Sequence, residues 1–163
     1  MIDKAFFIGI ENWPLAVLIA KSPWLFPTIE TIHVLALTMV VGTIAMVDLR
    51  LLGVRNANSA ADELIAETLP WTWTAFAFAV VSGLSMFISK AATYAYNPLF
   101  LFKIGLIALA GLNMAVFHLG AFRTVTAWAS ASRPPLGARV AGALSLLVWV
   151  LVVVMGRWVG FTT

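Results

Sequence analysis

Four segments of this chain are each long and apolar enough to cross the hydrocarbon core of a membrane, which takes about 20 helical residues. They cover residues 27–52, 71–89, 98–122 and 138–158. Hydrophobic residues make up 62% of the 163 residues and charged residues 10%, which is more apolar surface than a soluble domain of this length can bury. The sequence therefore predicts an all-α fold: an integral membrane four-helix bundle that forms one transmembrane domain over residues 1–163.

The ends of the predicted helices carry residues that are typical of such positions. Pro27, Pro70 and Pro98 stand at helix starts, where a missing N–H is harmless. Ser59 and Asp62 have the spacing of an N-cap and its capping-box partner, which predicts a short helix between the first two spans. Aromatic residues that favour the membrane–water interface cluster near the helix ends: Trp24, Trp71, Trp73, Tyr94, Tyr96 and Trp158.

The N-terminal segment differs from the four spans. Its apolar stripe is interrupted by Asp3, Lys4, Glu11, Asn12 and Pro14, so the segment is too short and too broken to cross a bilayer. We expect a helix over residues 3–20 that lies in the membrane interface.

Charge and cysteine content limit the classes of function. The chain has no cysteine, which excludes disulfides, thiolate metal sites, iron–sulfur clusters and covalently attached haem. No basic tract indicates nucleic-acid binding. The arginines gather on the side of the first and third loops, which favours that side as cytoplasmic. We therefore expect both termini on the opposite, outer side of the membrane.

His33 and His118 are the two histidines of the chain, and both fall inside predicted spans. Ionisable residues at membrane depth are costly and indicate function. Counted from Pro27 and Pro98, the two histidines lie about 9 and 30 Å into helices that start on the same side, at 1.5 Å per residue. A separation of about 20 Å along the membrane normal favours two sites over one haem clamped between both imidazoles.

We call the depth of His33 the outer level and the depth of His118 the inner level. The outer level contains side chains that could bind a haem. His33 would be an axial ligand, with Met86 or Met155 as the other, and Lys103 and Arg157 would meet the propionates. Glu30 precedes His33 by three residues, a spacing that carboxylate-bridged metal sites also use. The alternative is structural: Glu30 pairs with Arg157 or Lys103, and His33 forms a hydrogen bond between helices.

The inner level contains groups that suit copper. Thioether and imidazole ligands favour Cu(I), and a second haem on His118 is another reading. The alternative here is ordinary packing together with an interfacial salt bridge between Asp48 and either Arg50 or Arg123. The predicted copper ligands are Met46, Asp48, Met114 and His118.

Small residues are spaced four apart in the last span. Ala138 with Gly142, and Gly156 with Gly160, form pairs of the kind that let helices approach closely. Such pairs serve packing within the bundle or a homo-oligomer, either a dimer or a trimer.

The segment from Glu30 to Gly53 reads ETIHVLALTMVVGTIAMVDLRLLG, and the third span includes FLFKIGLIALAGLN with Lys103, followed by His118. Together they resemble a family of small bacterial membrane proteins of unknown function, over most of the chain. That resemblance implies a location in the bacterial inner membrane, where the outer side that holds both termini is the periplasm. More distantly, the early His33 and Lys103 are similar to the group of copper-resistance protein D and HemJ-type protoporphyrinogen oxidase. That resemblance implies haem b or copper at the membrane.

Three classes of function follow. The first is a membrane haem b protein that transfers electrons or reacts with a small molecule or quinone-like partner, which would make it a membrane oxidoreductase or an electron carrier. The second is copper handling, with or without haem. The third is a non-catalytic partner subunit whose histidines only form hydrogen bonds.

Overall fold

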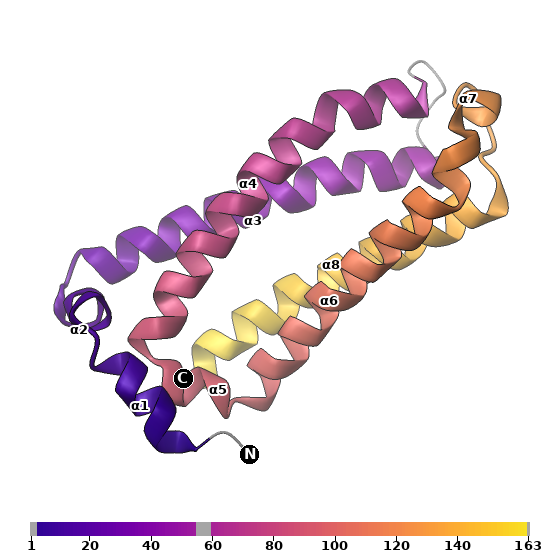
Figure 1. The fold of residues 1–163 in the computed structure, drawn as a ribbon. Coiled ribbons are helices and arrows are strands. Elements are labelled where there is room, and N and C mark those ends of the chain that lie inside the picture. Colours follow the sequence, from indigo (N-terminus) through magenta and orange to yellow (C-terminus); the bar gives the residue numbers. More distant parts are fainter. Residues whose placement is uncertain (1–2, 55–59, 163) are drawn as a thin grey trace.

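The computed structural model describes residues 3–54 and 60–162, and all regular structure in these ranges is helical. Four helices are long and apolar enough to cross a membrane, the third together with the short turns that continue it to Trp128. The predicted all-α fold with four apolar spans is confirmed. The long helices are α3 (Leu25–Leu51), α4 (Ala61–Ser89), α6 (Pro98–Leu119) and α8 (Leu136–Thr162) (Figure 1).

Short helices cover the two ends of the bundle (Figure 1). At one end, the N-terminal segment forms two helices where the sequence predicted one. Pro14 begins the second helix because a proline has no N–H with which to continue the first. The short helices are α1 (Lys4–Glu11), α2 (Pro14–Lys21), α5 (Ala91–Ala95), η1 (Ala121–Thr124) and α7 (Val125–Trp128).

Helix α4 begins at Ala61, well before the predicted Trp71, so Pro70 lies inside the helix and not at its start. The early turns carry acidic residues, which lower the mean hydropathy, yet Leu64 and Ile65 are buried and hold this part in the bundle. Pro27 lies in the first turn of α3 and Pro98 is the first residue of α6, so these two prolines stand at helix starts, as predicted. The predicted cap at Ser59 lies outside the described residues.

The bundle consists of two helical hairpins joined along one seam. Helix α3 packs on α4, α6 packs on α8, and α3 packs on α8 (Figure 1). Within the described residues the backbones of α4 and α6 do not approach each other closely, although the rings of Phe87 and Phe100 stack between them with centres 5.6 Å apart. One apolar cluster fills the α7 end and a second fills the middle of the bundle. Large apolar side chains are exposed along the outer faces of the spans, which is the surface that lipid would cover: Leu35, Val81, Phe102, Leu112 and Leu147.

The seam between α3 and α8 depends on small residues. A Cβ atom at Gly142 would lie 3.0 Å from the carbonyl oxygen of Asp48 and 3.1 Å from Cβ of Leu51, and Ala138 is fully buried. This pair therefore packs within the bundle. A Cβ at Gly160 would meet nothing within 4 Å, and a homo-oligomer at that position stays a prediction.

A buried arginine anchors the loop that follows α7. Arg50 is 1% exposed, and its guanidinium donates hydrogen bonds to the carbonyl oxygens of Ala129 at 2.6 Å and Ala131 at 3.3 Å. The carbonyl of Ala129 also accepts a hydrogen bond from the backbone N–H of Ala61, at the start of α4. The bonds of Arg50 tie the connection between α7 and α8 to the end of α3.

A buried asparagine, Asn97, joins two helices at the other end of the bundle. Asn97 is the N-cap of α6 and accepts hydrogen bonds from the backbone N–H groups of Leu99 and Phe100. Its amide also donates to the hydroxyl of Thr162 at 2.9 Å. The start of α6 is thereby attached to the end of α8.

Candidate functional sites at two levels of the bundle

His33 on α3 is half-buried against α4. Its Nδ1 lies 3.0 Å from the carbonyl oxygen of Ala79 and 3.0 Å from the hydroxyl oxygen of Ser82. A carbonyl oxygen can only accept, so Nδ1 carries the hydrogen, and a neutral ring then has its lone pair on Nε2. Gly83 makes room for the ring, because a Cβ there would lie 3.1 Å from Cε1 of His33.

Lys103 on α6 lies close enough to His33 to act on it electrostatically. Its side chain crosses α8 at Gly156, where a Cβ would lie 3.5 Å from the ammonium nitrogen. The structure therefore brings Lys103 and His33 to one level of the bundle, as the sequence predicted.

Other residues of the predicted outer set have separate surroundings. Glu30 is exposed, and the guanidinium of Arg157 lies over the ring of Phe161 at 4.6 Å, so these two side chains do not form the predicted ion pair. Met155 packs against the apolar cluster in the middle of the bundle. Met86 is half-buried one turn beyond Ser82, on the same face of α4.

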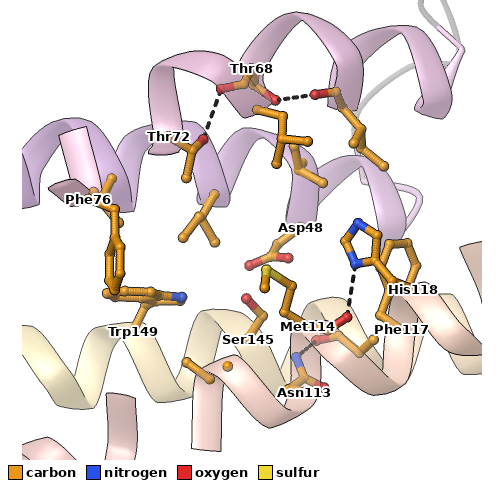
Figure 2. Close-up of a pocket in the computed structure, with 18 of the residues that line it drawn as sticks. Asp48, Thr68, Thr72, Phe76, Asn113, Met114, Phe117, His118, Ser145 and Trp149 are labelled. Atoms are coloured by element: carbon orange, nitrogen blue, oxygen red, sulfur yellow. Dashed lines mark hydrogen bonds between the residues drawn. The ribbon is translucent and has the colours of Figure 1, made fainter. Parts of the chain in front are cut away.

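A cavity of about 300 Å³ lies nearer the α7 end, among the four long helices. Its exposed lining residues lie on α4 and α6, so it opens between these two helices: Leu69, Trp73, Gly111 and Met114. Figure 2 shows its aromatic wall and its polar groups. Its aromatic and polar lining consists of Asp48, Thr68, Thr72, Trp73, Phe76, Asn113, Phe117, His118, Ser145 and Trp149.

Asp48 is the most deeply buried acid of the described chain, at 4% exposure. Its Oδ2 is buried and has no hydrogen-bond partner, and the hydroxyl of Ser145 on α8 faces the carboxylate (Figure 2). The predicted salt bridge to Arg50 or Arg123 is wrong. Residues two apart on a helix point in different directions, so Arg50 binds the loop after α7, and Arg123 is exposed on η1.

His118 lines the cavity from α6. Its Nδ1 lies 2.9 Å from the carbonyl oxygen of Met114 one turn earlier, so this ring also has its hydrogen on Nδ1 (Figure 2). Phe122 packs against the imidazole, with ring centres 5.0 Å apart. The ring is therefore fixed by its own helix and by an aromatic neighbour.

The predicted copper ligands come together only in part. Asp48, Met114 and His118 line the cavity, whereas Met46 is 38% exposed and does not line it. Met46 and Asp48 are two apart on α3, which directs them to different faces. Among the described residues, no three His, Cys, Asp or Glu side chains form a group that could hold a metal ion.

The two histidines belong to different sites. Fifteen residues separate His33 from Asp48 on α3, about 22 Å of helix rise. His118 shares its cavity with Asp48, while His33 contacts α4 at Ala79 and Ser82.

Several site residues were not predicted from the sequence. Trp149 lies in the middle of a span, away from the interfaces where tryptophan is usual, and that position was a usable signal. Gly83 and Gly156, which accommodate His33 and Lys103, give no such signal because glycine is common in membrane helices.

The fold and the sites define a multi-pass α-helical membrane protein that has a histidine and a lysine at one level of the bundle and a buried aspartate at a cavity. Residues 24–162 match the model of a family of unknown function, DUF6644, and the chain belongs to that family. Searches of curated proteins and of solved structures found no match. These comparisons do not link the chain to the copper-resistance protein D or HemJ-type group.

Proposed function

We propose that this protein binds haem b within the membrane, through His33, and transfers electrons or reacts with a small molecule or quinone-like partner. One observation carries the proposal: His33 donates its Nδ1 hydrogen to a backbone carbonyl and is left with a free Nε2, next to Lys103. Metal-binding histidines almost always use the second ring nitrogen in this way, which fixes the ring and its tautomer.

The residues at the outer level suit the parts of a haem. His33 would be one axial ligand, and Met86 on α4 would be the other. The ammonium of Lys103 would pair with one propionate, and Arg157 would meet the other. The bound haem would supply one-electron chemistry. The chain itself holds the imidazole in one orientation through Ala79 and Ser82.

A second candidate function is copper binding at the inner level. The observation that favours it is the meeting of the Met114 thioether, the Asp48 carboxylate and His118 around one cavity (Figure 2). Thioether and imidazole are ligands that Cu(I) prefers.

The haem proposal is tested by the visible spectrum of detergent-purified protein from haem-replete cells, oxidised and then reduced with dithionite. We expect a Soret band, sharp α and β bands after reduction, and one haem per chain. His33→Ala should lose the haem, while the matched variant His118→Ala should keep it.

A colourless wild-type protein, or a normal haem spectrum in His33→Ala, would overturn the proposal. Metal analysis after loading with Cu(I) then separates the remaining classes. Copper that binds the wild type but not Met114→Leu supports copper handling, and protein without metal supports a partner subunit.

We also propose that the α7 end, which carries most arginines, faces the cytoplasm of a bacterial cell and that both termini lie in the periplasm. Because the chain has no cysteine, single cysteines report topology without background. The Ser132→Cys variant should react with a membrane-impermeant maleimide only in inverted vesicles, and the Thr93→Cys variant only in intact spheroplasts. The reverse pattern would invert the orientation.

A further inference from the structure

The cavity at the inner level has an aromatic wall and a buried acid, Asp48. One carboxylate oxygen of Asp48 has no hydrogen-bond partner. We propose that this cavity binds amphiphilic organic amines, with the ammonium group on Asp48 and a ring-bearing apolar body along the aromatic residues. The proposal concerns the inner level and does not depend on haem at His33.

Three other polar residues that line the cavity already have hydrogen-bond partners within the protein. Asn113 donates to the carbonyl of Ala141, and Thr72 donates to the carbonyl of Thr68. His118 donates from Nδ1 to its own helix. Asp48, by contrast, has a buried carboxylate oxygen with no hydrogen-bond partner.

A carboxylate at membrane depth is costly unless a cation or a hydrogen-bond donor compensates it. Arg50, the nearest cation in sequence, donates to Ala129 and Ala131 instead. A ligand with a charged N–H donor would supply the missing partner, since charge-assisted hydrogen bonds to carboxylates are among the strongest.

The aromatic wall indicates the rest of the ligand. Trp73, Phe76 and Trp149 line the cavity, and the rings of Trp73 and Phe76 meet edge to face, with centres 5.9 Å apart. Aromatic faces attract ammonium groups and stack with aromatic rings. A volume of about 300 Å³ is at the small end of ligand sites, which suits one ring with a short chain.

The route of entry is lateral. The cavity opens between α4 and α6, where Trp73 is 51% exposed and Met114 is 40% exposed. Exposed apolar side chains of a spanning helix face lipid, and amphiphilic amines partition into lipid. The ligand would therefore reach Asp48 from the bilayer.

The test compares 3-phenylpropylamine with butylbenzene, its uncharged analogue of nearly equal shape, by calorimetric titration of the full-length protein in detergent. We expect saturable binding of the amine and at least tenfold weaker binding of butylbenzene. Asp48→Asn keeps the side-chain shape and should weaken amine binding more than tenfold. The matched control Glu30→Gln removes an exposed carboxylate from the same helix and should bind as the wild type does.

A second pair of variants keeps the proposal testable where Asp48→Asn does not fold. Gly111 lines the cavity, and a Cβ added there would meet nothing within 4 Å, so Gly111→Leu should fill the cavity and abolish amine binding. Gly105→Leu, on the same helix but away from the cavity, should leave binding unchanged.

Equal binding of amine and butylbenzene to the wild type, or unchanged amine binding in Asp48→Asn or Gly111→Leu, would overturn the proposal. The titration is done on protein with and without bound haem. A failure of the haem assignment therefore does not affect its result.

Discussion

A single methyl group at the seam between α3 and α8 should destabilise the protein. In Gly142→Ala the new Cβ would lie 3.0 Å from the Asp48 carbonyl oxygen, whereas ordinary contacts are 3.4–4 Å. The obstacle is backbone and not a side chain that can rotate away, so α3 and α8 must separate locally. Overpacking of this kind costs about 1–3 kcal/mol. Alanine recovers about 1 kcal/mol of helix propensity, and we therefore expect a net loss of about 1 kcal/mol.

Gly105→Ala is the matched control because a Cβ at Gly105 meets nothing within 4 Å. This variant should gain up to about 1 kcal/mol from helix propensity alone. Unfolding in mixed micelles of increasing SDS content, followed by circular dichroism, measures both variants. Gly142→Ala should unfold at lower SDS than the wild type and Gly105→Ala at equal or higher SDS. Equal stability of the two variants would refute the close contact between α3 and α8.

Three further variants test other parts of the structure. Arg50→Met should lower the free energy of unfolding by about 2–3 kcal/mol because charged hydrogen bonds to buried carbonyls are lost, while exposed Arg139→Met should change thermal unfolding little. Asn97→Ala should cost about 1–2 kcal/mol through loss of the N-cap. Thr162→Ala removes the link to Asn97 and a hydrogen bond within α8 but keeps the N-cap, so it should cost less; equal thermal shifts would assign the effect to the link. Gly83→Ala should displace the His33 ring and shift the reduced α band of bound haem without abolishing it, and an unchanged spectrum would contradict the position of that ring.

The long spans could be predicted from the sequence because a run of apolar residues needs no partner to be recognised. The start of α4 could not be placed, since Pro70 lies inside a helix whose early turns are held in the bundle by buried Leu64 and Ile65. Tertiary packing overrides the local preference of proline for a helix start. The N-terminal break at Pro14 depends on local chemistry, yet the sequence was interpreted as one interfacial helix.

The sites, too, could be predicted from the sequence only in part. The rise per residue predicted that His33 and His118 lie at different levels, and the structure places them with different neighbours. Which side chains meet was not predictable: Met46 points away from the cavity, and Arg50 binds a loop 79 residues further along the chain. Such contacts depend on how the helices rotate about their axes, which hydropathy does not specify.

By itself the sequence determined that this chain forms apolar helices of membrane-spanning length with a histidine in each of two spans. Hydropathy and helical rise are local properties, and they can be read from one segment at a time. Only the tertiary structure decided that a cavity opens between α4 and α6 and that one carboxylate oxygen of Asp48 has no hydrogen-bond partner there. Such features depend on how closely helices approach, as α3 and α8 do at Gly142, and that distance belongs to a pair of helices and not to one sequence segment.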